Sequence, residues 1–125
     1  MLLNPKISKM IGTSYSKMDC WSIVREFYSI QFGKELRAYY DTVPETRDKA
    51  RALVLNSMKD FEEVKAPIFG DIILIKLFGI ESHIAVYLGE GLMLHTSEHS
   101  GCIIERSARW EKLVVGYYRV RAKND

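Results

Sequence analysis

The sequence predicts an α+β fold with an antiparallel sheet, because its helical and strand-forming segments are separated along the chain. In the first half, apolar residues recur at the spacing of amphipathic helices. From Asp71 onward the pattern changes to β-branched and apolar runs separated by glycine-containing turns. Helices first and strands afterwards, in hairpin order, indicate N-terminal helices packed on a central antiparallel sheet.

Length and charge exclude several classes of protein. A chain of 125 residues with 47% hydrophobic content suits one domain over residues 1–125, and no repeat or linker divides it. The net charge of +2 comes from basic residues mixed with acids, so we expect no nucleic-acid partner. We also expect no secretory signal and no membrane span, because no apolar run has the necessary length or flanks.

Two helices are predicted before the sheet. The first covers residues 19–32, with Asp19 as its N-cap, Gly33 as its stop, and an apolar stripe on one face. The second opens at residues 42–45, Thr-Val-Pro-Glu, which have the form of a capping box with proline in the first turn. Its stripe is Ala50, Leu53, Val54, Met58 and Phe61, and residues 65–70 end it.

The second half of the chain predicts five strands. Their apolar and β-branched runs are bounded by glycine-rich turns, and one helical turn at residues 108–112 precedes the last of them. The predicted strands are residues 72–77, 82–88, 92–96, 102–106 and 113–120.

Cys20 is the first candidate for chemistry. It lies in the first turn of the first predicted helix, where unpaired N–H groups and the positive helix end favour an anion. The thiolate is the nucleophilic form of cysteine, and helix N-termini lower the pKa of a thiol. The sequence therefore predicts a nucleophile at Cys20, provided that a histidine can reach it.

His83 and His95 lie on neighbouring predicted strands, and the turn between them sets their relation. If the loop is the three residues 89–91, Ala85 faces His95 and His83 faces Ser97. The two imidazoles then lie on one face as diagonal neighbours, within hydrogen-bonding reach. A two-residue loop would put them on opposite faces, so we expect the longer loop.

With that register, the three residues can perform acyl transfer. Cys20 would attack a carbonyl carbon, and His83 would take the thiol proton and later protonate the leaving amine. His95 would fix the tautomer and orientation of His83, as the third member of a triad does. The backbone N–H of Cys20 is a candidate oxyanion donor.

The cysteine and histidine side chains could alternatively form a zinc site. Zinc accepts cysteine and histidine, but Cys20, Cys102, His83, His95 and His99 include no close Cys-x-x-Cys or His-x-x-x-His pair. We therefore expect no metal and read both cysteines as free thiols in a reducing compartment, although the sequence leaves a Cys20–Cys102 bridge open.

Four ordered motifs make the sequence recognisable. They are Asp19-Cys20-Trp21-Ser22-Ile23-Val24, Gly70-Asp71-Ile72-Ile73-Leu74, His83-Ile-Ala-Val-Tyr-Leu-Gly89 and Leu94-His95-Thr96. Together they resemble the NlpC-type cysteine peptidases, compact papain-like enzymes that cut peptidoglycan stem peptides. The tryptophan after the cysteine and the closing Gly116-Tyr-Tyr-Arg-Val120 look most like the tail-assembly branch of phages and prophages.

The resemblance implies a role for each matching residue. Cys20 would be the nucleophile, His83 the base and His95 the third member, and no metal or organic cofactor would be needed. Tyr15 would line the site, with Asp19 and Trp21 as auxiliary residues beside the cysteine. The family usually has a glycine-rich approach to the cysteine, whereas Ser16, Lys17 and Met18 stand here.

The resemblance also implies a setting. The expected partners are a peptidoglycan peptide as substrate and other phage tail proteins, with the chain made in the host cytoplasm and destined for the virion tail. Two alternatives share the fold: a tail-tip assembly protein with little activity, and a papain-like acyltransferase that uses the same thioester.

Overall fold

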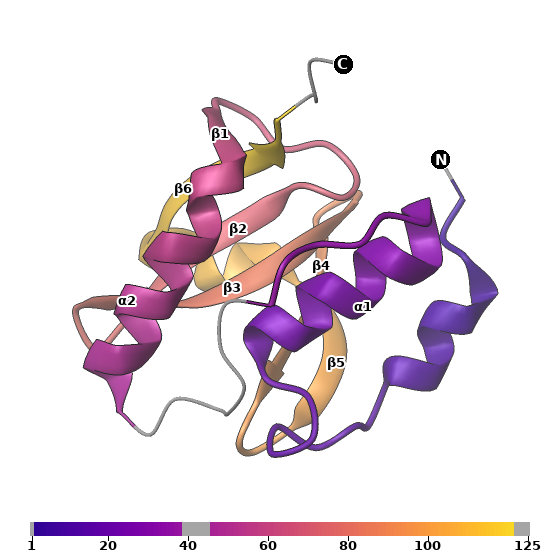
Figure 1. Ribbon diagram of the computed structural model, residues 1–125, viewed down its shortest axis with the longest axis horizontal. Helices are drawn as coiled ribbons and strands as arrows, with labels where there is room; N and C mark the ends of the chain where they lie inside the picture. The colour runs from indigo at the N-terminus through magenta and orange to yellow at the C-terminus, as the bar shows by residue number, and fades with distance from the viewer. Residues whose placement is uncertain (1, 39–45, 122–125) are drawn as a thin grey trace.

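Six strands of the described residues form one antiparallel sheet in the order β1-β6-β2-β3-β4-β5 (Figure 1). The computed structural model describes residues 2–38 and 46–121. The sheet strands are β1 (Phe61–Val64), β2 (Ile72–Leu77), β3 (Ile80–Gly89), β4 (Leu92–Ser97), β5 (Gly101–Arg106) and β6 (Val114–Val120). The helical elements are η1 (Pro5–Met10), α1 (Cys20–Phe32), α2 (Arg47–Ser57), η2 (Met58–Asp60) and η3 (Ser107–Leu113). The predicted α+β class is confirmed.

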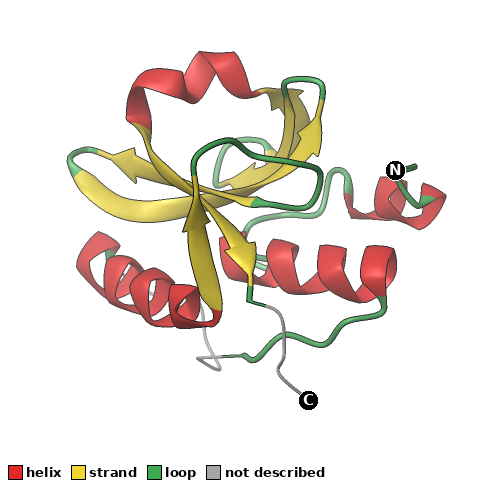
Figure 2. Cartoon of the chain, turned by 90° about the horizontal axis from the view of Figure 1, so that it is seen from above, coloured by secondary structure: helices red, strands yellow, loops and turns green. Residues whose placement is uncertain are grey.

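The sheet lies between α1 and α2 on one side and η3 on the other (Figure 2). Strand residues alternate between the two faces, so each face buries its own apolar set. Under α1 these are Ile72, Leu74, Ile84, Val86, Leu94 and Cys102. Under η3 they are Ile73, Ile75, Ala85 and Met93, with Trp110 packed against them. Both faces of the central strands are buried, which explains their nearly continuous apolar runs.

Helix α1 forms as its sequence predicts. The Asp19 carboxylate accepts a hydrogen bond from the Ser22 backbone N–H at 3.1 Å and one from the Ser22 hydroxyl at 2.7 Å. Gly33 ends the helix in the left-handed region, at φ 63°, a conformation that glycine adopts without a steric penalty. The apolar stripe turns inward, with Phe27 and Val24 fully buried.

Helix α2 differs from the prediction at both ends. The expected capping box at residues 42–45 lies outside the described residues, and the helix begins at Arg47, with the Thr46 hydroxyl as its cap. It ends at Ser57, and Phe61 begins strand β1, which pairs with β6 opposite Val120. The assignment of Phe61 to the helix was therefore wrong. An isolated apolar residue is compatible with the spacing of a helix or of a strand, and here the pairing with β6 makes Phe61 part of a strand.

The turn between β3 and β4 corrects the expected three-residue loop. Gly89 pairs with Leu92, so the turn consists of Glu90 and Gly91, both with positive φ. A register shift between Tyr87 and Gly89 inserts one extra residue into β3. This bulge restores the predicted pairing of Tyr87 with Met93, so the two histidines still share a face despite the shorter turn.

The segment before α1 is held along the outer edge of β5. The Gly12 backbone N–H donates to the Cys102 carbonyl at 2.8 Å, and the Cys102 N–H donates to the Thr13 carbonyl at 2.9 Å. These bonds pair the exposed edge of the sheet and hold the approach to Cys20 in place. In the described part of the chain, no helix is long and apolar enough to cross a membrane.

Candidate functional site

Cys20 is the first residue of α1 and points into the helix side of the core. Its side chain is 6% exposed and packs in the apolar cluster that includes Ile84. The backbone N–H groups of Ile84, Trp21 and Cys20 itself lie close enough to the sulfur to favour its ionised form. The Ile84 contact places the thiol against the backbone of β3, at the residue that follows His83.

The environment of Cys20 favours the neutral thiol. Burial raises its pKa to about 12, the charge of Asp19 contributes in the same direction, and the three backbone N–H groups lower it only in part. The helix N-terminus therefore does not by itself produce a thiolate, contrary to the expectation from position alone. Nucleophilic attack needs a base that removes the proton.

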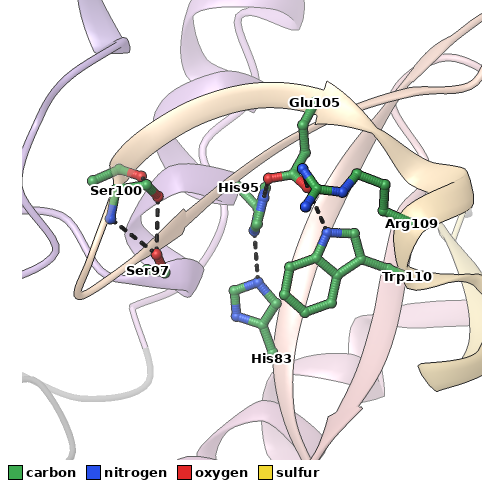
Figure 3. Close-up of polar contacts among 8 residues, drawn as sticks. His83, His95, Ser97, Ser100, Glu105, Arg109 and Trp110 are labelled. Carbon is green, nitrogen blue, oxygen red and sulfur yellow. Dashed lines mark hydrogen bonds and ion pairs between the residues drawn. The ribbon is translucent and has the colours of Figure 1, made fainter.

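His83 and His95 meet as the hairpin register requires. The Nε2 atom of His83 lies 3.0 Å from Nδ1 of His95, and both side chains are buried (Figure 3). Their rings cross at 78° with centroids 5.2 Å apart, and the Trp110 ring lies against both. The predicted contact between the two imidazoles is confirmed, and it lies on the η3 side of the sheet.

Cys20 and the imidazoles thus approach β3 from its two faces. The pairing of β3 with β4 begins at the turn and ends at the Val86–Leu94 pair. All residues of these two strands are described, and none beyond that pair is matched across the two strands. At the level of His83 and His95, β3 and β4 are consequently not paired with each other, although β3 is paired with β2 and β4 with β5. The Cys20 sulfur reaches the β3 backbone in this region, at Ile84.

Glu105 and Trp110 complete the polar chain, and sequence reasoning missed both. Oε2 of Glu105 lies 2.9 Å from Nε2 of His95, and the Trp110 indole N–H donates to Oε1 at 2.8 Å. Burial opposes ionisation of Glu105, but hydrogen bonds from His95 and Trp110, with the charges of His95 and Arg109, outweigh it and lower its pKa. Figure 3 shows the resulting order His83–His95–Glu105–Trp110.

The position of Glu105 depends on the β4–β5 turn. Ser97 pairs with Gly101, and the Ser97 and Ser100 hydroxyls are 2.9 Å apart across this turn. The register places Glu105 opposite Met93, diagonal to His95 on the same face. The available sequence signal was an acidic residue of matching parity on the strand next to His95. That signal becomes meaningful only when the turn length is known.

The three auxiliary residues occupy different environments. Asp19 is buried and caps α1, which gives it a structural position. Trp21 is 3% exposed and its indole N–H donates to the Arg37 carbonyl at 2.8 Å, so its ring packs in the core. Tyr15 is half-buried in the turn before α1, five positions ahead of Cys20 in the chain.

The described residues include no metal cluster, and the hollow in the surface lies away from the predicted site residues. No group of three or more His, Cys, Asp or Glu residues among those described is arranged to hold a metal ion. Cys20 and Cys102 are both free, buried thiols. A hollow of about 630 Å³ lies over β1, β6 and η3, lined by residues such as Glu63, Glu111 and Tyr117, and none of its lining residues is a predicted site residue.

Comparison with known proteins identifies the relatives. The chain matches the NlpC/P60 family over residues 9–119. Among solved structures, it is similar to the NlpC/p60 domain of the peptidoglycan hydrolase SagA, with 18% identity and TM-score 0.57 over 94% of this chain and 93% of that one. An NlpC/P60 family protein from Bacillus cereus gives 17% identity and TM-score 0.63, covering 94% of this chain.

A third similar structure is a lipoprotein-like NLP/P60 family protein from Staphylococcus aureus, with 19% identity and TM-score 0.62 over 94% of this chain. This chain spans 40% of the Staphylococcus chain and 39% of the Bacillus chain. A search of curated proteins finds no match. At these identities the solved structures establish the fold, with helices packed against an antiparallel sheet.

Proposed function

The chain belongs to the NlpC/P60 family, and we propose from this that it is a cysteine peptidase that cuts an amide bond in peptidoglycan stem peptides. The structural relative SagA is described as a peptidoglycan hydrolase, which supports this substrate class. The bond usually cut in the family joins D-glutamate to a diamino acid, so a stem peptide that contains this bond is the first substrate to test.

The observation that carries the proposal is the hydrogen-bonded pair of imidazoles, which begins at His83, the neighbour along β3 of the residue whose backbone lies close to Cys20. His83 Nε2 and His95 Nδ1 are 3.0 Å apart, and Cys20 contacts the amide of the residue after His83. The combination supports Cys20 as nucleophile, His83 as base and His95 as the orienting third residue.

The proposed reaction begins with a neutral thiol, because burial raises the pKa of Cys20 to about 12. In this proposal His83 Nδ1 removes the proton as the sulfur attacks the amide carbonyl carbon. The backbone N–H of Cys20 stabilises the oxyanion. His83 then protonates the leaving amine, and a water molecule hydrolyses the thioester and releases the carboxylate product.

Incubation with a defined substrate tests this proposal. The reduced protein is mixed with a stem peptide containing the D-glutamyl–diamino acid bond, and mass spectrometry follows the new amine and carboxylate. We expect cleavage by the wild type and by C102A, a matched control at the other buried thiol, and none by C20A. Wild-type protein that leaves the peptide intact under reducing conditions across pH 5–9 would contradict the proposal.

A finer proposal concerns the biological setting. The Asp19-Cys20-Trp21 motif and the Gly116–Val120 ending resemble the tail-assembly branch, which supports a phage or prophage tail protein synthesised in the host cytoplasm. In an assembled phage, a folded C20A variant that still gives infectious particles would favour the alternative of an assembly protein whose activity is dispensable. Transfer of the acyl group from Cys20 to an added amine instead of water would favour the acyltransferase.

A further inference from the structure

The tautomers of both histidines are determined by the carboxylate at the end of the polar chain. An ionised carboxylate only accepts hydrogen bonds, so His95 must present Nε2–H to Glu105 across the 2.9 Å contact. In a neutral imidazole the other nitrogen is then an acceptor. Nδ1 of His95 therefore accepts from His83, and the shared proton lies on Nε2 of His83.

This order of donors gives His83 a defined chemistry. With the proton on Nε2, the lone pair of neutral His83 is on Nδ1. That nitrogen can accept the thiol proton in the proposed reaction. The opposite order, with Nδ1–H on both rings, would present a donor to the thiol in place of a base.

Trp110 makes the direction of the chain depend on the charge of Glu105. The indole N–H is a donor only, and it uses Oε1 at 2.8 Å while His95 uses Oε2. Both side-chain oxygens of Glu105 must therefore accept a hydrogen bond at the same time. A carboxylate has two such oxygens, whereas the amide of a glutamine has only one. Arg109 adds only a long contact of 3.8 Å from a side chain that is 75% exposed, so it is secondary.

We propose that Glu105 is a positioning residue that, held by Trp110, selects the Nε2–H tautomer of His95 and thereby of His83. It acts through His95 and does not touch the substrate. Its link to catalysis rests on the proposed peptidase function, but the tautomer selection itself is a property of the folded protein without substrate.

Nitrogen-15 NMR of the imidazoles tests the selection directly, because protonated and unprotonated ring nitrogens have distinct shifts. At a pH where both rings are neutral, we expect Nε2–H on His83 and His95 in the wild type. In E105Q the amide oxygen should turn to Trp110 and the NH₂ to His95, which reverses both rings to Nδ1–H. Nδ1–H on either ring of the wild type would overturn the proposal, even where E105Q does not fold.

A double variant provides a rescue that a general loss of stability would not. In E105Q/W110F no indole competes for the amide oxygen, so the oxygen can turn to His95 and the Nε2–H tautomers should return. E111Q, which removes an exposed charge from the same segment η3, should leave the wild-type tautomers in place. Unchanged tautomers in E105Q, or no return in the double variant, would overturn the role assigned to Glu105 and Trp110.

Kinetics on the stem peptide supply the second readout. We expect kcat of E105Q to fall by roughly 10²–10⁴-fold, as for a base held in the wrong tautomer, with KM little changed and partial recovery in E105Q/W110F. If the wild type has the expected tautomers but no peptidase activity, the proposed function fails and the selection by Glu105 stands. If E105Q keeps full activity and the wild-type tautomers, the inference fails and the peptidase stands.

Discussion

Two opposing influences act on the Cys20 sulfur. The start of α1 supplies backbone N–H groups that favour the thiolate, while burial and the charge of Asp19 favour the thiol. The second set prevails and raises the pKa to about 12, so the thiol would stay protonated at pH 7 without a base. At the scale of the residue, reactivity is therefore a property of the Cys20–His83 pair.

Alkylation of Cys20 measures this dependence on His83. In H83A, the rate of carbamidomethylation by iodoacetamide should rise about tenfold per pH unit from pH 7 to 10, because the raised pKa leaves no plateau in that range. The wild type should react measurably faster at pH 7. Peptide mapping separates Cys20 from Cys102.

The control for this experiment is H99A, which removes an exposed histidine in the β4–β5 turn and should behave as the wild type. Equal rates for H83A and wild type at neutral pH would show that His83 does not serve Cys20.

Gly101 shows how a single residue holds the approach to the site. It has φ +65°, and a Cβ atom there would lie 2.7 Å from the Thr13 carbonyl oxygen. We expect G101A to lower the free energy of unfolding by about 2–3 kcal/mol, since both the backbone conformation and the contact become unfavourable.

Gly79 is the matched control for that prediction. Its φ is +78°, but apart from its chain neighbours no atom of the described residues lies within 4 Å of the place that a Cβ would take. G79A should cost about 1 kcal/mol, from the backbone conformation alone. Chemical denaturation compares the two variants, and equal losses would mean that the Thr13 contact is unimportant.

At the scale of the element, the first turn of α1 couples helix stability to thiol chemistry. Asp19 accepts from the backbone N–H and the hydroxyl of Ser22, and its charge raises the pKa of Cys20 after the larger effect of burial. A cap that stabilises the helix therefore also suppresses the thiolate. The two effects depend on different properties of the side chain, its shape and its charge.

Substitution of Asp19 separates these effects. D19A should lower the free energy of unfolding by about 0.5–2 kcal/mol through loss of the cap, whereas D19N keeps a capping oxygen and should lose less. Both variants should lower the pKa of Cys20, because the neighbouring negative charge is gone. The alkylation rate at pH 8–9 should therefore rise in both, and an unchanged rate in D19N would contradict the electrostatic role.

At the scale of the whole molecule, an ion pair joins the turn before β2 to the last strand, β6. Asp71, immediately before β2, receives two hydrogen bonds from the Arg119 guanidinium of β6, at 2.9 and 2.8 Å. Asp71 also accepts from the Ile68 N–H, and the neighbouring Gly70 carbonyl accepts from the Tyr28 hydroxyl of α1. Asp71 therefore joins the turn before β2 to β6, and the adjacent Gly70 joins the same turn to α1.

Removal of the guanidinium should weaken this junction. R119M should lower the midpoint of thermal unfolding by several degrees, because the carboxylate of Asp71, with 3% of its side chain exposed, loses its cation. R121M, at an exposed position two residues further on, should change it little. The double variant D71N/R119M should recover part of the loss, and no recovery would contradict the explanation by an unpaired buried charge.

The sequence was sufficient for features that depend on neighbours along the chain. Asp19 and Gly33 bound α1 because caps act within one turn, and five of the six strands follow from apolar and β-branched runs between turns. The predicted contact between His83 and His95 is confirmed, but the loop length on which that prediction rested was wrong, and a bulge in β3 compensates for it. The family resemblance rested on the same local motifs.

Only the tertiary structure decided the features that depend on distant segments. Strand β1 (Phe61–Val64) forms because it pairs with the edge of β6. The β3–β4 turn is one residue shorter than expected, and the bulge in β3 restores the predicted pairing beyond it. Glu105 joins His95 through the register of a second hairpin, and Trp110 arrives from η3. Burial of Cys20 likewise sums contacts from α1 and β3. The physical reason is the same in each case. The local sequence pattern determines which face of a strand or helix a side chain takes, whereas strand register and burial depend on the distant segments that pair with it or pack over it.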